Sequence, residues 1–227
     1  MLIEIADVLT PNELTEVRRL IQAAELVDGR VTAGEQAARS KHNLQLAQEA
    51  PAAKEAGEII LQALGRNPVF HSAALPYRVL APLFNCYDVG MRFDTHIDSA
   101  IRAVSGAGIR MRADVSSTLF LSDPQDYDGG ELVIEHNFGT SVVKLAAGSM
   151  VVYPAGSLHR VNEVTRGTRW SAFFWTQSML KDEGLRTLLY DFDRAIIEVR
   201  QQLGKDTRGT LALTNTYHNL LRRSAEL

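Results

Sequence analysis

The chain has 227 residues, of which 45% are hydrophobic, so it can bury the core of one large domain or of one domain with a small addition. Its formal net charge of −3 gives no basic field, which argues against nucleic acid as a partner. A single cysteine, Cys86, excludes an internal disulfide and suits a reducing compartment. Neither a signal-peptide pattern nor an apolar run long enough for a membrane span is present, so we expect a soluble, cytoplasmic protein.

The first part of the chain is predicted to contain a short strand and two helices. Apolar and polar residues alternate from Leu2 to Ile5, as in a strand. Thr10 and Glu13 have the spacing of a capping box around Pro11, which marks the start of an amphipathic helix. The alanine-rich segment from Ala52 to Leu64 is predicted to be a second helix.

A glycine-containing segment at residues 29–43 separates these helices. Its basic side chains are Arg30, Arg39 and Lys41. A basic loop over a metal site would bind an anionic substrate, whereas a solvated loop would have no such role. The sequence favours neither interpretation.

From Val69 to Thr176, short apolar runs alternate with turn residues, which predicts antiparallel strands. The expected strands are Tyr77 to Tyr87, Met91 to Ile97, Ser116 to Leu121, Glu131 to Glu135, Ser141 to Leu145, Ser149 to Tyr153, Arg160 to Val164 and Arg169 to Thr176. Eight short strands fit a double-sheet jelly roll, whose open end suits a metal and a co-substrate. The predicted fold class is therefore mainly β with flanking helices, around a double-stranded β-helix core that begins at about residue 77.

One segment between the predicted strands, Ile101 to Asp114, differs from its surroundings. It contains Gly106, Gly108, Arg102, Arg110 and Arg112. We expect a mobile loop beside the site, which would exclude water and select substrate, or else a plain connection.

The last part of the chain is predicted to form a helical hairpin. Leucines and other apolar residues recur at helical spacing from Asp182, Gly204 interrupts them, and a second amphipathic helix covers Leu211 to Leu221. The hairpin would either pack on the barrel or provide the contact surface of a homodimer, and the sequence does not distinguish these alternatives. The predicted domains are residues 1–177 and a C-terminal helical extension at 178–227.

The chemistry of the chain centres on His96-x-Asp98. On an extended strand the side chains of residues i and i+2 point the same way, so His96 and Asp98 would lie side by side. His159, on a later strand, would complete the set of two histidines and one carboxylate that holds Fe(II) in non-haem oxygenases. Arg169, ten residues after His159, is a cation that would hold the far carboxylate of an organic co-substrate.

These residues also allow other interpretations. His96 and Asp98 could instead form a structural hydrogen-bonded pair, with His159 capping a turn. Asp94 would share a face with His96 and Asp98, but three consecutive groups on one face reach one metal with difficulty, so His159 is the better third ligand. His136 is expected at the surface.

The sequences of several segments resemble those of one known family. These segments are MRFDTHIDSA from Met91, the DGGEL turn from Asp128, YPAGSLHRVNEVTRGTRWSAFFWTQS from Tyr153, and VDGRVTAG from Val27. They resemble the PKHD-type hydroxylases, which are bacterial Fe(II)/2-oxoglutarate dioxygenases associated with iron uptake and similar to the prolyl 4-hydroxylase domain. The resemblance covers nearly the whole chain. One departure is Cys86, where an arginine is expected, and it leaves the metal ligands untouched.

The resemblance implies how the remaining cofactors would bind. With His96, Asp98 and His159 on Fe(II), 2-oxoglutarate would take two further positions and O2 the last. Strand alternation places Ser171 on the same face as Arg169, where it would add a hydrogen bond to the co-substrate. A tyrosine near the place of Tyr87 contacts the co-substrate in the resembling fold. The family also implies L-ascorbate, which would rescue over-oxidised iron.

The leading hypothesis is therefore a 2-oxoglutarate-dependent hydroxylase acting on a small-molecule or peptidyl substrate linked to iron or siderophore uptake. A cupin-like metalloenzyme would not use 2-oxoglutarate and would not need Arg169. A non-catalytic jelly roll that senses iron or a siderophore would bind metal without turnover. Consumption of 2-oxoglutarate separates the first hypothesis from the other two.

Overall fold

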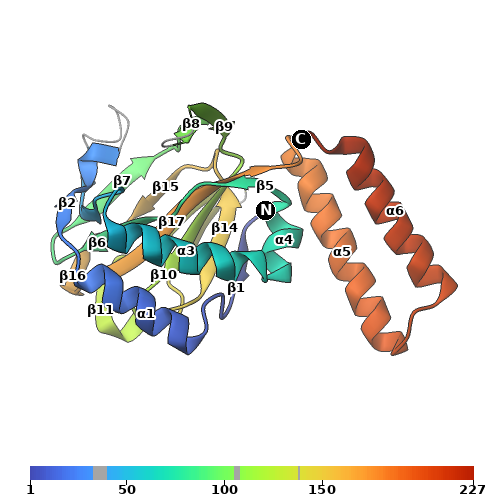
Figure 1. Cartoon of the computed structure of the whole chain (residues 1–227), viewed down its shortest axis with the longest axis horizontal. Coiled ribbons are helices and arrows are strands. Elements are labelled where there is room, and N and C mark those ends of the chain that lie inside the picture. Colours follow the sequence, from blue (N-terminus) through green and yellow to red (C-terminus); the bar gives the residue numbers. More distant parts are fainter. Residues whose placement is uncertain (33–39, 105–107, 138) are drawn as a thin grey trace.

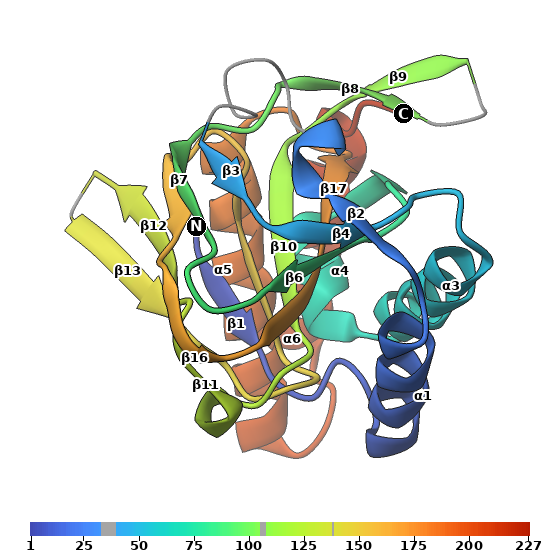
Figure 2. The same ribbon diagram turned by 90° about the vertical axis from the view of Figure 1, so that its left-hand side faces the viewer.

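Two antiparallel β-sheets face each other at the centre of the molecule, in a computed structural model that describes residues 1–32, 40–104, 108–137 and 139–227 (Figures 1 and 2). The larger sheet has the order β1 (Ile3–Ile5), β14 (Met150–Pro154), β10 (Val115–Phe120), β17 (Arg169–Ser178), β6 (Leu83–Tyr87), β4 (Leu44–Leu46) and β2 (Leu26–Asp28), with β5 (Pro76–Val79) paired to β17. The smaller sheet has the order β13 (Gly139–Val143), β12 (Leu132–His136), β15 (His159–Val161), β7 (Arg92–His96) and β3 (Lys41–His42). Two separate ribbons join β8 (Ile101–Val104) to β9 (Ile109–Arg112) and β11 (Tyr127–Gly129) to β16 (Val164–Gly167). The jelly-roll core predicted from the sequence is confirmed.

Helices cover the outer face of the larger sheet and extend from one end of it. They are α1 (Pro11–Gln22), α3 (Pro51–Gly65), α4 (Pro68–Ala74), α5 (Glu183–Leu203) and α6 (Arg208–Ser224), with short 3-10 turns at η1 (Gly29–Thr32) and η2 (Pro124–Asp126). α1 and α3 lie against the larger sheet, on the side away from the smaller one (Figure 2). The capping box predicted at the start of α1 is present, because the Thr10 amide donates to Glu13 Oε2 at 2.9 Å and the Glu13 amide donates to Thr10 Oγ1 at 3.4 Å.

Two hydrophobic clusters hold these layers together. One joins Val17 and Ile60 of the helices to Phe174 of β17 on the outer face of the larger sheet. The other lies between the sheets, where Phe120 of β10 packs with Leu132 of β12 and their neighbours. Both faces of the larger sheet are therefore buried, which explains why the six residues of β10 are all buried.

Two of the expected strands are each divided into two in the structure. The expected strand from Tyr77 to Tyr87 is two strands, β5 and β6, because Pro82 between them has no N–H for a ladder hydrogen bond. The strand expected from Arg160 to Val164 is likewise divided between β15 and β16.

α4 was not expected, since Asn67 and Pro68 were interpreted only as the end of α3. They also begin the next helix. Asn67 Oδ1 accepts a hydrogen bond from the Phe70 amide at 2.9 Å, and Pro68 occupies the first turn.

The segment from Ile101 to Asp114 is a β-hairpin rather than the expected loop. β8 and β9 pair in register from Ile101 opposite Arg112 to Val104 opposite Ile109. Gly106 lies outside the described residues, as does Arg39 of the basic segment before β3. The hairpin stands at the upper edge of the barrel, above β7 (Figure 2).

The C-terminal helical hairpin is confirmed and projects from one end of the barrel (Figure 1). α5 packs Leu189 and Ile196 against Leu75 and Leu180 at the end of the core. The Ser72 hydroxyl of α4 donates to Asp193 Oδ2 at 2.6 Å and fixes α5 beside α4. Within the described ranges, no helix has the length and apolar content that a membrane crossing requires.

Candidate active site

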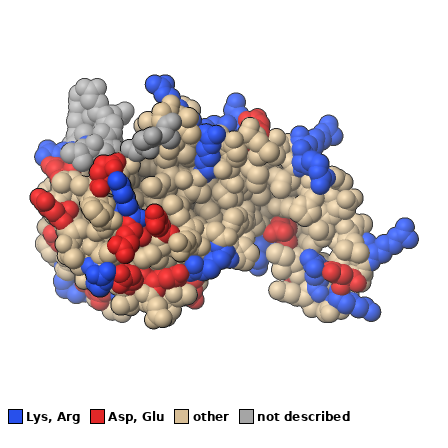
Figure 3. Space-filling view, viewed as in Figure 1, with Lys and Arg blue, Asp and Glu red and all other residues tan. Residues whose placement is uncertain are grey.

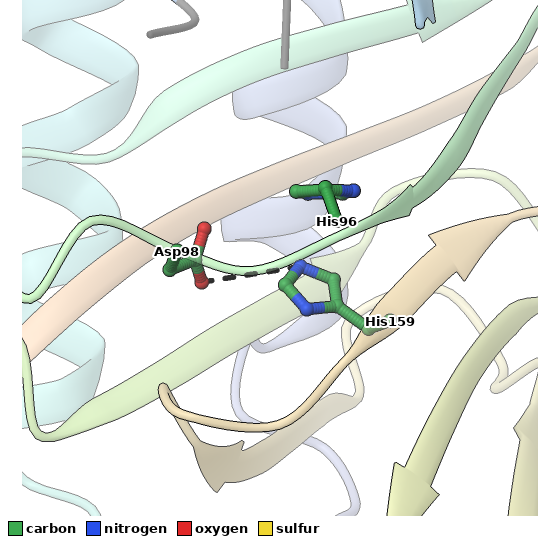
Figure 4. Close-up of side chains that lie close together, drawn as sticks. All are labelled: His96, Asp98 and His159. Carbon is green, nitrogen blue, oxygen red and sulfur yellow. Dashed lines mark ion pairs between the residues drawn. The ribbon is translucent and has the colours of Figure 1, made fainter. Parts of the chain in front are cut away.

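His96, Asp98 and His159 meet where β7 pairs with β15 (Figure 4). His96 and His159 are directly opposed across the two strands, and their ring centres are 4.2 Å apart. Asp98 Oδ2 lies 3.9 Å from His159 Nε2, and one potential ligand atom from each residue lies within 4.8 Å of the other two. The structure thus brings together the three residues that the sequence selected.

Asp98 reaches this position differently from the way that strand alternation suggested. β7 ends at His96, so Asp98 belongs to the loop that follows the strand. Its carboxylate is instead held by β10 of the opposite sheet, since the Ser116 hydroxyl donates to Asp98 Oδ2 at 2.6 Å. Ser116 was not predicted to be a site residue, because a serine in a strand carries no signal of its own.

Both imidazoles are oriented by the backbone. His96 Nδ1 lies 2.9 Å from the Asp94 carbonyl oxygen, and His159 Nδ1 lies 3.0 Å from the Ser157 carbonyl oxygen. A carbonyl oxygen can only accept, so each Nδ1 carries the proton and each Nε2 keeps its lone pair for a metal. Burial, and secondarily the neighbouring His159, lowers the pKa of His96 to about 4, so this imidazole is neutral near pH 7.

The donor set fits a divalent iron ion. Two neutral imidazoles and one carboxylate, held within 4.8 Å of one another, match the facial triad that leaves the other positions of Fe(II) open. No other His, Cys, Asp or Glu joins this group among the described residues. Asp94, the alternative ligand, points away from it, because its exposed carboxylate pairs with Arg92 at 3.0 Å.

The three residues line a cavity of about 750 Å³, part of it open to solvent, and Arg169 lies in its wall. The Arg169 side chain is only 1% exposed, and its Nη1 donates to Ser171 Oγ at 2.8 Å. Its Nε and Nη2 have no hydrogen-bond partner among the described residues. Buried donors without acceptors are costly, and a carboxylate is the group that fits the guanidinium fork. Arg169 could therefore hold a carboxylate in this cavity.

Arg169 is held in place from several sides. Its Cζ lies 5.3 Å from the ring centre of Tyr87 and 5.3 Å from that of Phe120. Gly130, from the DGGEL turn, has a φ of +64°, and a Cβ there would lie 3.0 Å from Arg169 Cδ. Position 130 therefore needs a glycine for two reasons: the backbone has a positive φ there, and a side chain would press on Arg169.

Tyr87 and Ser171 lie beside Arg169. Tyr87 is directly opposite Arg169 across β6 and β17, and Ser171 is opposite Asn85. Burial raises the pKa of Tyr87 to about 12, so its hydroxyl remains protonated. The Asn85 amide lies within 3.5 Å of the Tyr87 oxygen. All four residues line the cavity.

Other side chains also line the cavity. Lys41 and Arg102, from segments interpreted as loops, both line it. The aromatic side chains that do so include Phe93, Phe173 and Trp175.

Two expectations about residues outside the metal site are confirmed. His136 is exposed, with its Nε2 3.1 Å from Ser141 Oγ. Cys86 is 2% exposed and packs in the core, where burial raises the pKa of its thiol to about 12.

Comparisons with known proteins agree with this geometry. Residues 82–177 match the 2OG-Fe(II) oxygenase superfamily, and residues 183–226 match the PKHD-type hydroxylase C-terminal domain. The chain is 60% identical over 227 residues to a PKHD-type hydroxylase of Methylobacterium nodulans and 61% identical over 228 residues to one of Cupriavidus metallidurans, with 100% of each chain covered.

Among solved structures the fold is similar to two prolyl hydroxylases. The first, a prolyl-4-hydroxylase of Pseudomonas putida, has a TM-score of 0.53 and 22% identity over 78% of this chain and 92% of that one. The second, a prolyl hydroxylase of Trichoplax adhaerens solved with a hypoxia inducible factor peptide, has a TM-score of 0.56 and 16% identity over 82% and 86% of the two chains. At these identities the likeness concerns the fold alone.

Proposed function

The chain belongs to the PKHD-type hydroxylase family, and from this premise we propose that it hydroxylates its substrate at the site formed by His96, Asp98, His159 and Arg169. It is a 2-oxoglutarate- and Fe(II)-dependent oxygenase by family. The observation that carries the assignment of this site is the buried Arg169, which lines the same cavity as the three ligands and whose Nε and Nη2 have no hydrogen-bond partner among the described residues.

His96, Asp98 and His159 would hold the iron. The backbone carbonyls behind both histidines keep Nε2 available, and the low pKa of His96 means that no proton competes for its nitrogen near neutral pH. When bound, iron supplies the ability to activate O2 with 2-oxoglutarate as the electron source. The protein contributes orientation and exclusion of water.

Arg169 and Ser171 would bind the far carboxylate of 2-oxoglutarate. The free guanidinium edge suits a two-point contact, while Nη1 is already occupied by Ser171. Tyr87 would add the third contact through its protonated hydroxyl. The aromatic rings around the guanidinium exclude water and strengthen the ion pair.

The assignment is tested by anaerobic titration of the Fe(II)-loaded protein with 2-oxoglutarate, followed by visible absorption. Chelation by the keto acid should give a weak charge-transfer band that saturates at one equivalent. Arg169→Ala should still bind iron, while the midpoint of the titration moves to a much higher concentration. Arg166→Ala is the matched control, because Arg166 is exposed and pairs with Asp128 at 2.7 Å. An unchanged midpoint in Arg169→Ala would show that the far carboxylate is held elsewhere.

Asp98→Ala should lose iron affinity and turnover together, since the site has only one carboxylate among its described members. Asp191→Asn, an exposed carboxylate on α5, should change neither. Membership of an enzyme family argues against a non-catalytic sensor, and the donors of Arg169 argue against a cupin-like enzyme that does not use 2-oxoglutarate.

The biological setting is also a proposal. The family resemblance supports a cytoplasmic hydroxylase whose substrate is linked to iron or siderophore uptake, with L-ascorbate restoring iron that has become over-oxidised. Added ascorbate should then prolong activity during repeated turnover without changing the initial rate. A higher initial rate would contradict this role.

A further inference from the structure

Arg102 connects the β8–β9 hairpin to the wall of the active-site cavity. Its Cζ lies 3.5 Å from the ring centre of Trp175, and both residues line the cavity. Trp175 is 5% exposed and lies on β17, on the same face of the strand as Arg169. The position of the hairpin therefore sets the shape of the cavity on the side of Trp175.

The hairpin depends on contacts at its base. Among the described residues, β8 and β9 pair with each other and with no strand of the two large sheets. A two-stranded ribbon of this kind is at best marginally stable alone. Its base is closed by the Ala113 amide, which donates to the Ala100 carbonyl at 2.8 Å. The direction in which the ribbon points is then decided by the groups that hold the last residue of β9, Arg112.

Arg112 joins the hairpin to the end of β17. Its Nε donates to Asp114 Oδ1 at 2.6 Å, and its Nη2 donates to the Ser178 carbonyl at 3.3 Å. The Ser178 amide donates in turn to Asp114 Oδ2 at 2.9 Å. The side chains of Arg112 and Asp114 are 24% and 8% exposed, so water competes little for these contacts. Arg112 is thus fixed where the chain leaves the barrel for α5.

Glu226, which follows α6, is a third partner of Arg112. Its Oε2 lies 3.6 Å from Arg112 Nη1. The Glu226 amide donates to the Met179 carbonyl at 2.8 Å, which fixes the end of α6 beside the start of the C-terminal extension. Glu226 is the only acidic residue among the described residues that line the crevice here, whose basic members are Arg78, Arg110 and Arg112. Both ends of the C-terminal hairpin therefore meet the base of the β8–β9 hairpin.

The surface around this junction is basic. Basic side chains lie along the upper edge of the molecule, where β8 and β9 stand, whereas acidic ones gather on the lower left (Figure 3). Like charges repel one another, and the carboxylate of Glu226 offsets this repulsion among the arginines of the crevice.

We propose that the C-terminal helical extension positions the β8–β9 hairpin over the active-site cavity, with Arg112 as the positioning residue and Ser178 and Glu226 as its partners. Arg112 touches neither the proposed iron ligands nor Arg169. It acts through Arg102, whose contact with Trp175 shapes the space that the primary substrate would occupy. This inference rests on the proposed function, which makes the cavity an active site.

Trp175 itself reports on the hairpin, because the chain has only one other tryptophan, Trp170. The test uses the full chain with Trp170→Phe, loaded with Zn(II) and N-oxalylglycine, an unreactive analogue of 2-oxoglutarate. Quenching of the remaining fluorescence by acrylamide, which is uncharged, measures how well Arg102 covers the indole. Arg102→Met uncovers the ring directly and sets the upper reference, and Arg112→Met should raise the quenching constant toward it.

Arg110→Met is the matched control, because Arg110 lies two residues earlier on β9 and is exposed. It should leave the quenching constant unchanged. Far-ultraviolet circular dichroism of each variant shows whether the chain is folded. An unchanged quenching constant in a folded Arg112→Met chain, or an equal rise in Arg110→Met, would overturn the proposal.

Glu226→Gln keeps the shape of the side chain and removes its charge. An exposed ion pair shifts a local equilibrium by about 1.5- to 5-fold, so the quenching constant should rise by less than in Arg112→Met. The double variant should equal Arg112→Met alone, since Glu226 acts through Arg112. About 1 M salt should raise quenching in the parent chain and not in Glu226→Gln, because salt screens the pair. If Arg112→Met does not fold, equal quenching of Glu226→Gln and the parent chain at low salt would overturn the proposal.

Binding of N-oxalylglycine is measured by calorimetry in the same samples. It should be equal in the parent chain and in Arg112→Met, because Arg112 does not line the active-site cavity. Failure of the parent chain to bind would count against the proposed function. Normal binding with an unchanged quenching constant in Arg112→Met would count only against this inference.

Discussion

The Ser116 hydroxyl lies 2.6 Å from Asp98 Oδ2 and connects the larger sheet to the loop after β7, which provides the carboxylate of the proposed iron site. Without this hydrogen bond the loop is free to turn the carboxylate away from the two histidines. Ser116→Ala should therefore lower iron affinity about 10- to 100-fold, the usual effect of losing a partner of a metal ligand. Competition with a chelator measures the affinity. Ser141→Ala, which removes a hydroxyl whose partner is the exposed His136, should leave it unchanged. Equal affinities in the two variants would mean that the loop is fixed by its own backbone.

Gly130 supports Arg169 by having no side chain. Gly130→Ala should destabilise the protein by about 1–2 kcal/mol, because φ is positive, and should also raise the Kd for 2-oxoglutarate, because the new methyl group would press on Arg169. Gly204→Ala is the matched control, since Gly204 has the same φ of +64° and a Cβ there would have no neighbour within 4 Å. It should show the loss of stability alone. Thermal unfolding and the anaerobic titration separate the two effects, and a normal Kd in Gly130→Ala would contradict this role.

The Cys86 thiol should be inert in the folded protein. Burial raises its pKa to about 12, so the reactive thiolate is scarce near pH 8. A disulfide reagent should label the protein only after a denaturant has been added. Because the raised pKa favours the protonated thiol in the folded state, this contribution to stability is present below the unfolded pKa, near 9, and is lost as the pH rises toward 12. Rapid labelling of the folded protein would show that this part of the core opens.

Two adjacent leucines distinguish the buried and exposed sides of α5. Leu189 is 2% exposed in the cluster that joins the hairpin to the core, whereas Leu188 is 66% exposed. Leu189→Ala should lower the free energy of unfolding by about 2–5 kcal/mol, and Leu188→Ala by much less. Denaturant titration measures both.

The homodimer suggested by the sequence stays a prediction. If the exposed side of the hairpin forms it, Leu188→Asp should convert a dimer into a monomer in light scattering while the unfolding midpoint of the monomer is retained. A wild-type chain that is monomeric at every concentration would exclude the dimer.

The sequence determined the fold class and predicted the metal ligands, because both depend on local patterns. Short alternating apolar runs specify strands with one face in a core, and the capping residues around Pro11 specify where α1 begins. His96-x-Asp98 and His159 were recognisable because few residue types bind Fe(II). The resemblance of several segments to a known family then indicated the co-substrate, which hydrophobic periodicity alone does not identify.

Tertiary structure alone decided which distant groups support the site. Ser116 contacts Asp98 because the two sheets face each other, and Gly130 backs Arg169 because β11 and β16 bring the turn behind β17. Lys41 and Arg102 belong to segments whose sequence is equally compatible with solvated loops, so only the folded chain places both cations in one cavity. The physical reason is that contacts between residues far apart in the chain depend on sheet packing and strand register, which no local pattern encodes.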